Sequence, residues 1–246
     1  MDWPLELAEN ANTYTPLGPD DERIVTERYV LWLGRGDEPH WNVAQRFRLR
    51  RDEIEPVQEE IHAHLRARNR TACTWEVGSH ATPLDLAERL LALGLEQQEL
   101  AVGMVLTEPP AETPPAVEVR RAATPEDRLT AAWIAAVAFG GPDPTGPPPP
   151  DPNNVVYLAF LGGEPVARAS ASFSEHGVTL FGGATLPDAR GRGAYRALVA
   201  ARWEDAVRRR TPVLVTQAGA MSRPILARLG FHEVCELRIL LDAFGG

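Results

Sequence analysis

The chain has 246 residues, of which 44% are hydrophobic, and carries a formal net charge of −9 at pH 7. This length suffices for two ordinary domains or one large one, and the hydrophobic content excludes a wholly disordered chain. The acidic balance argues against a general nucleic-acid-binding protein, because such proteins need basic surfaces to neutralise phosphates. It is compatible with a cationic substrate such as an amine.

Cysteine usage and the N-terminus give further limits. Cys73 and Cys235 are too few for a disulfide scaffold, and both lie in apolar, strand-like surroundings where burial is expected. No basic segment followed by an apolar core opens the chain, so no signal peptide is predicted. The longest apolar stretch, 131–139, is too short to cross a bilayer. We therefore expect a cytoplasmic protein that is not bound to a membrane.

The first part of the chain predicts alternating strands and helices after a polar arm of about 22 residues. A helix is expected at 53–69, where apolar residues recur at helical spacing. A second helix is expected from Thr82-Pro83, a hydroxyl N-cap followed by proline, to Gly94. Strands are expected where β-branched and aromatic residues cluster, at 28–33, 43–49, 71–77 and 99–106.

A proline-rich segment divides the chain. Residues 108–115 contain four prolines, and such a composition continues neither a helix nor a sheet. We expect a stiff linker at 108–116 between an N-terminal domain, residues 1–107, and a C-terminal domain, residues 117–246.

The second part predicts the order β-α-loop-β-β-β-α-β-α-β. Its first helix begins at Thr124-Pro125, followed by carboxylates in the first turn, and ends near Phe139 before a proline-rich loop at 140–153. Gly182-Gly183 suggests a bulge in the strand that they interrupt. The remaining strands are expected at 117–121, 154–161, 165–173, 177–185, 212–216 and 231–241, with helices at 196–210 and just before Gly230.

A basic, glycine-rich turn joins the strand ending at Thr185 to the long helix that follows. Gly191 and Gly193 allow a tight turn and a close approach of the backbone to a ligand. The amides that would open the helix lack partners within it, namely those of Arg192, Gly193, Ala194 and Tyr195. Since the helix dipole favours negative charge at this end, the sequence predicts a phosphate or pyrophosphate site.

This turn resembles the pyrophosphate loop of the GCN5-related N-acetyltransferase (GNAT) superfamily. The family pattern, Arg/Gln-x-x-Gly-x-Gly/Ala, is read here at Arg190, Gly193 and Tyr195, of which Tyr195 departs from the small residue expected. A second landmark, 223–231, resembles the closing helix of the family, which commonly ends in Leu-Gly-Phe as at 229–231 here. The order of elements also matches, with a proline-rich loop in place of the usual second helix. The resemblance implies an α/β (α+β) fold with a mixed sheet.

The two halves of the chain share a closing β-α-β pattern. Residues 91–95 and 227–231 each end a proline-initiated helix that lies between two strands. We interpret the first half as a degenerate GNAT-like copy of the complete second half, although any β-α-β unit would give a similar pattern. Arg35-Gly36 is followed by Asp37, Glu38 and Pro39, which would repel phosphate. Tandem acetyltransferases with one inactive half are common in bacteria, so the resemblance implies a single cofactor site.

The resemblance also implies the reaction, which is transfer of an acetyl group from acetyl-CoA to an amine of a small molecule or protein. It places the pantetheine along Ala184, Thr185 and Leu186, and makes the Leu186 backbone amide the group that polarises the acyl carbonyl. Ser222 stands where the family has an Asn, and would contact the thiol or pantetheine, or serve only as a helix cap. The pyrophosphate would lie on Arg190, Gly191, Arg192, Gly193, Ala194 and Tyr195.

The acid and base of this reaction are not evident. The tyrosine that commonly acts as general acid falls at Leu226, and leucine cannot donate a proton. Glu175 and His176 lie near a turn, and many family members use a chain of water molecules as the base. A catalytically silent acyl-CoA-binding or interaction protein is therefore the alternative. Glu59 and His62 alone do not make a complete set of metal ligands, so no metal is expected. The sequence is compatible with either a monomer or a homodimer.

Overall fold

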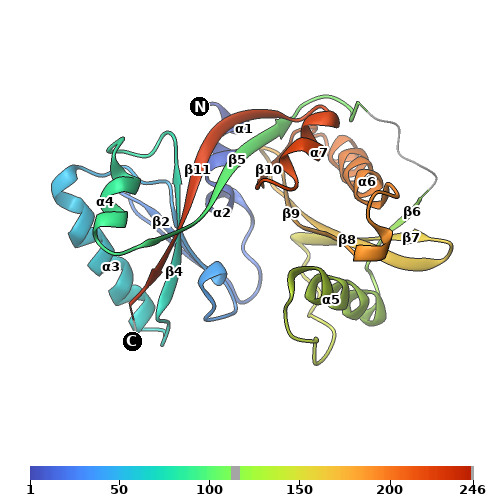
Figure 1. Cartoon of the computed structure of the whole chain (residues 1–246), viewed down its shortest axis with the longest axis horizontal. Coiled ribbons are helices and arrows are strands. Elements are labelled where there is room, and N and C mark those ends of the chain that lie inside the picture. Colours follow the sequence, from blue (N-terminus) through green and yellow to red (C-terminus); the bar gives the residue numbers. More distant parts are fainter. Residues whose placement is uncertain (112–116, 245–246) are drawn as a thin grey trace. The chain divides into compact units, whose positions relative to one another are not determined.

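The structure is a computed structural model that describes residues 1–111 and 117–244, and the chain forms two compact units (Figure 1). Of the linker expected at 108–116, residues 112–116 lie outside the described part. The first unit comprises Met1–Met104, Gln217–Pro224 and Glu233–Gly246, and the second comprises Val105–Thr216 and Ile225–His232.

The first unit begins with two short helices, α1 (Trp3–Glu9) and α2 (Ala11–Tyr14). The prediction of a polar arm without regular structure in this segment was wrong. The Asp2 side chain accepts a hydrogen bond from the Leu5 amide at 3.3 Å, and Pro4 lies in the first turn. The sequence pattern did not predict this helix, because a helix of seven residues is too short to show an apolar repeat.

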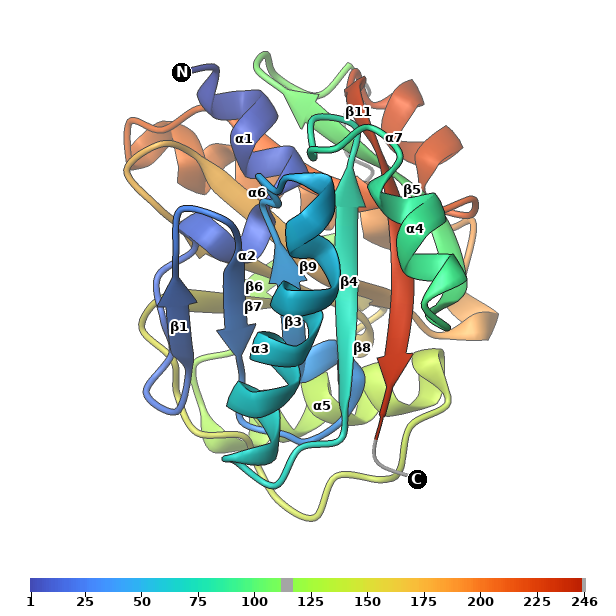
Figure 2. The same cartoon turned by 90° about the vertical axis from the view of Figure 1, so that its left-hand side faces the viewer.

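The sheet of the first unit has the strand order β1-β2-β3-β4-β11-β5. Strand β3 is parallel to β4, and β4 is antiparallel to β11. Figure 2 shows α3 (Ile54–Arg66) and α4 (Leu86–Ala92) on one face of this sheet. The strands are β1 (Glu22–Val25), β2 (Val30–Leu33), β3 (Asn42–Gln45), β4 (Ala72–Gly78), β5 (Glu96–Leu106) and β11 (His232–Ala243).

The C-terminal strand completes the sheet of the N-terminal unit. Strand β11 pairs with β4 from Leu237 opposite Gly78 to Ala243 opposite Ala72, and Leu240 is fully buried in the same cluster as Trp75. The two units therefore divide the chain differently from a single cut at 108–116. The sequence predicts a closing strand, whereas its position beside β4 depends on the burial of its apolar residues, such as Leu240, in the core of the first unit.

The second unit has the strand order β10-β9-β8-β7-β6, in which β6 to β9 are antiparallel and β10 is parallel to β9. Tyr157 donates a hydrogen bond to Asp205 of α6, whereas its neighbour Leu158 packs with Ala131 and Ile134 of α5. Because neighbouring strand residues point to opposite faces, α5 and α6 cover opposite faces of this sheet. The elements are β6 (Glu118–Arg121), α5 (Pro125–Phe139), β7 (Asn154–Leu161), β8 (Glu164–Phe173), β9 (Val178–Thr185), α6 (Ala194–Arg208), β10 (Leu214–Ala218) and α7 (Arg223–Arg228).

Strand β9 carries the bulge expected at Gly182-Gly183. Ser170 of β8 faces Phe181, but Arg168 faces Ala184, so both glycines lie opposite Ala169 alone. Gly182 has a φ of +52°, and a Cβ on Gly183 would lie 2.7 Å from Cε2 of Tyr195. Glycine is therefore needed twice, once for the backbone conformation and once to admit an aromatic ring.

A buried carboxyl in the first unit gives a prediction about stability. Burial raises the pKa of Glu76 on β4 to about 7, although its side chain accepts a hydrogen bond from Gln217 at 3.1 Å. The folded state holds this proton more tightly than the unfolded chain, so the stability it contributes is complete below about pH 4.5 and is lost as the pH rises toward 7. The difference in pKa corresponds to about 3 kcal/mol.

We expect Glu76→Gln to flatten the fall in unfolding free energy between pH 5 and 7, measured by urea denaturation at about five pH values. Glu96→Gln, at an exposed position on β5, is the control and should leave the slope as in the wild type. An unchanged slope in Glu76→Gln would show that this carboxyl does not hold its proton.

The glycine bulge gives a second prediction. Gly183→Ala should lower the unfolding free energy by about 1 kcal/mol or more, because the added methyl group must displace the Tyr195 ring. A Cβ at Gly146 meets no atom within 4 Å, so Gly146→Ala is the matched control. Equal stability of the two variants, measured by thermal and urea unfolding, would show that the ring does not pack against Gly183.

Candidate functional site

Helix α6 begins without a cap from any described side chain. Its N-cap is Gly193, with a left-handed φ of +90°, and no acidic residue lies in its first turn. A non-glycine residue would be strained in this conformation, which accounts for the glycine. The opening amides of α6 therefore point to a place where an anion can accept their hydrogen bonds.

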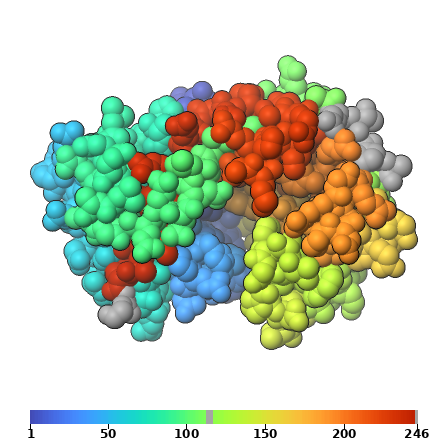
Figure 3. Space-filling view, viewed as in Figure 1, coloured from blue at the N-terminus to red at the C-terminus, as the bar shows by residue number. Residues whose placement is uncertain are grey.

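The turn before α6 adds positive charge to that place. Arg190, Gly191 and Arg192 are all exposed, and Gly191 is also left-handed, at +74°. The Arg192 amide, expected to be free, donates a long hydrogen bond of 3.4 Å to the carbonyl of Ala189. The site thus consists of the first amides of α6 and two exposed guanidinium groups. In the space-filling view this segment, in orange, reaches the surface of the second unit (Figure 3).

The matching helix of the first unit begins in a different way. Helix α3 follows β3 as α6 follows β9, but a 3-10 turn, Arg51–Glu53, leads into it. A capping box closes that turn, in which the Glu53 carboxylate accepts from the Arg50 amide at 2.8 Å. Asp52 and Glu55 add negative charge to this start. The Arg35-Gly36 turn considered from the sequence instead packs on Trp41 between β2 and β3. The start of α3 is therefore unsuited to phosphate.

Strands β9 and β10 separate soon after they pair. Their parallel register covers Val178 with Leu214 and Thr179 with Val215, and the Thr216 hydroxyl then donates to the carbonyl of Leu180 at 3.1 Å. Beyond this point the described residues of β10 form no further pair with β9, although β9 continues to Thr185. An unpaired strand edge thus leads directly to the turn before α6, and an extended ligand could add to it as a strand does.

The Leu186 amide faces away from this open edge. Its N–H donates to the carbonyl of Val166 on β8 at 2.9 Å, so this amide is engaged within the sheet and does not point to the open edge, where the carbonyl-polarising role expected of it would require it. In an antiparallel pair, residues alternate between those bonded to the partner strand and those that face away from it. The N–H of Thr185 therefore faces the open side. Sequence spacing missed this because it does not give the register of β9 on β8.

Tyr195 is packed rather than placed among the phosphate contacts. Its ring lies against Gly183, and its phenol interacts electrostatically with the buried guanidinium of Arg202. Burial raises the pKa of the Tyr195 phenol. The Arg202 guanidinium also donates to the carbonyls of Leu198, at 2.9 Å, and Ser170, at 3.3 Å. The departure from a small residue is thus accommodated because the side chain turns inward and leaves the amide of residue 195 at the helix start.

Two other sequence candidates lie at the closing helix α7. The Ser222 hydroxyl donates to the carbonyl of Gly219 at 3.4 Å in the turn before α7. Contact of Ser222 with a thiol or pantetheine stays a prediction. Leu226 is 1% exposed and so belongs to the core.

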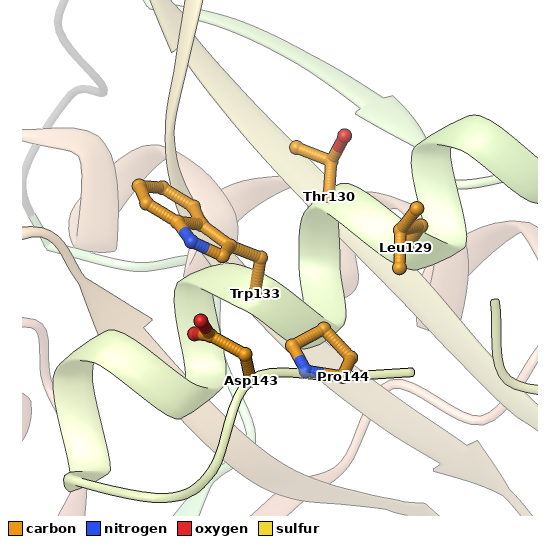
Figure 4. A pocket seen from close by; sticks show the side chains of 5 residues that line it. All are labelled: Leu129, Thr130, Trp133, Asp143 and Pro144. Atoms are coloured by element: carbon orange, nitrogen blue, oxygen red, sulfur yellow. The ribbon is translucent and has the colours of Figure 1, made fainter. Parts of the chain in front are cut away.

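A separate hollow of about 400 Å³ lies on the outer face of α5. Leu129 and Trp133, four residues apart, share this face, whereas Ala131 and Ile134 point to the sheet. Figure 4 shows the Trp133 ring and the Asp143 carboxylate at its edge. The hollow lies on the side of α5 that faces away from the sheet, so it is distinct from the open edge of β9. Its lining residues are Leu129, Thr130, Trp133, Asp143 and Pro144.

The described residues hold neither a cluster of metal ligands nor a membrane-spanning helix. They contain no group of three or more His, Cys, Asp and Glu side chains that could hold a metal ion. None of their helices is long and apolar enough to span a bilayer.

No protein-family model matches the chain, and no curated protein matches its sequence. Solved structures match it over nearly its full length. A GCN5-related N-acetyltransferase from Kribbella flavida matches with a TM-score of 0.72 and 21% identity, over 92% of this chain and 91% of that one. A tandem GNAT protein from the clavulanic acid biosynthesis pathway matches with a TM-score of 0.60 and 14% identity, over 99% and 94%. A GCN5-related N-acetyltransferase from Sphaerobacter thermophilus gives 0.60 and 18%, over 91% and 83%. The protein therefore has the mixed α/β fold of the GCN5-related N-acetyltransferase superfamily.

Proposed function

We propose that the protein is an acetyl-CoA-dependent N-acetyltransferase whose second unit binds the cosubstrate. The observation that carries this proposal is the start of α6, which no described side chain caps and which lies at the end of an unpaired stretch of β9. A diphosphate needs several N–H donors and positive charge, and this place offers both. The similarity in fold supports the same activity.

The cosubstrate would lie along residues that the structure leaves available. The amides of Gly193, Ala194 and Tyr195 would donate to the diphosphate, flanked by Arg190 and Arg192. The pantetheine amides would pair with the open edge of β9 at Thr185. The neighbouring Ala184, also expected from the sequence, has its backbone groups toward β8 by the same alternation, so it would contact the pantetheine only from beside that edge. In this arrangement the thioester end reaches the part of β9 that faces no neighbouring strand.

Bound acetyl-CoA would supply the acetyl group as a thioester. The neutral amine nitrogen forms the new bond to the acetyl carbon, the carbon–sulfur bond breaks, and the amine loses a proton while the sulfur leaves as thiol. The Thr185 N–H, rather than that of Leu186, would stabilise the negative charge that develops on the carbonyl oxygen. A thiol has a pKa of about 8.5, so its thiolate can leave without a strong acid at the position of Leu226.

The alternative is a catalytically silent acyl-CoA-binding protein. It is favoured by Leu226, whose buried side chain stands where a tyrosine is usual. Release of free thiol from acetyl-CoA in the presence of a panel of amines separates the two functions, because turnover excludes the silent protein.

The first unit would be a degenerate copy that binds no cofactor. The acidic start of α3 supports this, as does the likeness of the whole chain to a tandem GNAT. Titration calorimetry should therefore give one acetyl-CoA site per chain. Absence of any heat at millimolar acetyl-CoA would remove both the transferase and the silent binding protein.

A charge placed in the turn tests the position of the diphosphate. A Cβ at Gly191 meets no atom within 4 Å, and Asn and Asp are the residues that best tolerate its left-handed backbone. Gly191→Asp should weaken acetyl-CoA binding by about tenfold or more, because a buried or nearby like charge costs over 1 kcal/mol. Gly191→Asn has the same shape without the charge and should bind within about threefold of the wild type. Equal affinities of Gly191→Asp and Gly191→Asn would show that the diphosphate lies elsewhere.

A further inference from the structure

Arg168, on β8, is a cation without an anionic partner among the described residues. Its Nη1 donates to the carbonyl of Gly182 at 2.7 Å, and its Nε is buried and makes no hydrogen bond. Arg120 and Arg121 of the same unit are, in contrast, paired with Asp127 and Asp205. The charged group that acts on Arg168 is instead a second cation, Arg202.

The position of Arg168 relates it to the open edge of β9. It lies directly opposite Ala184 in the β8–β9 register, so the two side chains share a face of the sheet. That face is the one covered by α5, because Ala184 packs with Ala131 and Ile134. Thr185, whose amide would hold the acyl carbonyl, follows Ala184 directly. In the proposed complex, Arg168 therefore lies opposite the residue of β9 that directly precedes Thr185, whose amide would bind the reacting carbonyl.

The glycine bulge also gives room to this guanidinium. A Cβ on Gly182 would overlap Nη1 of Arg168, and both Gly182 and Gly183 are exposed. The arginine itself is only partly exposed. Nη1 of the guanidinium thus lies beside the exposed Gly182, whereas Nε is buried.

The charge on Arg168 persists at neutral pH. Burial, and to a smaller extent the Arg202 charge, lowers the pKa of Arg168 to about 10, so the guanidinium stays protonated. An uncompensated cation at low dielectric attracts an anion strongly and repels a purely cationic ligand. The overall charge of −9 makes this local positive site stand out. Arginine forms bidentate hydrogen bonds with a planar carboxylate in particular.

We propose that Arg168 binds a carboxylate of the acceptor, so that the substrate is an amine that also carries a carboxylate, as in an amino acid or a peptide with a free C-terminus. This inference rests on the proposed acetyltransferase function and adds the class of acceptor. It makes Arg168 a residue that determines specificity, since the guanidinium holds the acceptor and takes no part in the proton transfer.

The test compares matched acceptors. Amino acids and dipeptides with a free carboxylate, and the same compounds as C-terminal amides, are assayed by thiol release with the full chain. We expect the wild type to show a kcat/KM for the free acids at least about tenfold above that for the amides, the size expected for a charge-assisted hydrogen bond. Equal values, or a preference for the amides, would overturn the proposal and leave the acetyltransferase function standing.

Variants of Arg168 locate the effect. Arg168→Gln should raise the KM of the free acids by about tenfold or more, with little change for the amides, and Arg168→Lys should restore part of the preference. Arg210→Gln removes the same charge at an exposed position of the same unit and should behave as the wild type. A loss in Arg168→Gln that is equal for both acceptor classes would assign Arg168 a purely structural role.

A binding measurement covers the case of slow turnover. The CoA-saturated protein is mixed with N-acetylated amino acids or their amides, which are the expected products, and its melting temperature is recorded. A rise with the acids that is absent in Arg168→Gln supports the proposal. No rise with any carboxylate at millimolar concentration contradicts it, whereas failure of the proposed function itself would appear separately as absence of heat with acetyl-CoA.

Discussion

The start of α6 is the feature on which the candidate site depends. The first N–H groups of any α-helix have no partner within the helix, and a Ser, Thr, Asp or Asn side chain at the N-cap commonly accepts a hydrogen bond from one of them. Here the N-cap is a left-handed glycine without a side chain. The helix thus keeps donors that an external anion can use, next to the basic, exposed turn formed by Arg190, Gly191 and Arg192.

The α3 helix shows how the same topology can lose such a site. Each helix follows a strand that has one antiparallel and one parallel neighbour. The parallel neighbour is β4 for β3, which precedes α3, and β10 for β9, which precedes α6. Between β3 and α3 the chain has no glycine, and a 3-10 turn, Arg51–Glu53, leads into the helix with the Glu53 carboxylate bonded to the Arg50 amide. Asp52, Glu53 and Glu55 place negative charge where an anion would otherwise bind.

The bulge at Gly182-Gly183 links the packing of the second unit to its chemistry. Gly183 admits the ring of Tyr195 from the first turn of α6, and Arg202 of the same helix donates a hydrogen bond to the Ser170 carbonyl of β8. Gly182 admits the guanidinium of Arg168 on the α5 side. Two adjacent glycines therefore serve both faces of one strand, so the start of α6 and the charged group near Ala184 are fixed together.

The sequence by itself determined the local features of this protein. Gly191 and Gly193 indicated the turn and the helix start, Thr124-Pro125 indicated α5, and Gly182-Gly183 indicated the bulge, because each signal depends on backbone conformation within a few residues. These local signals, in their order along the chain, were enough to predict the fold family.

Only the tertiary structure decided which strands are neighbours and which way each group points. The place of β11 beside β4 depends on buried contacts between residues some 160 positions apart, and no local pattern encodes them. The register of β9 on β8 turned the Leu186 amide to Val166 and left that of Thr185 free. Arg168 had no sequence signal, because a charged residue in a strand is usually paired or solvated, and its lack of a partner follows from the packing of residues distant in the chain.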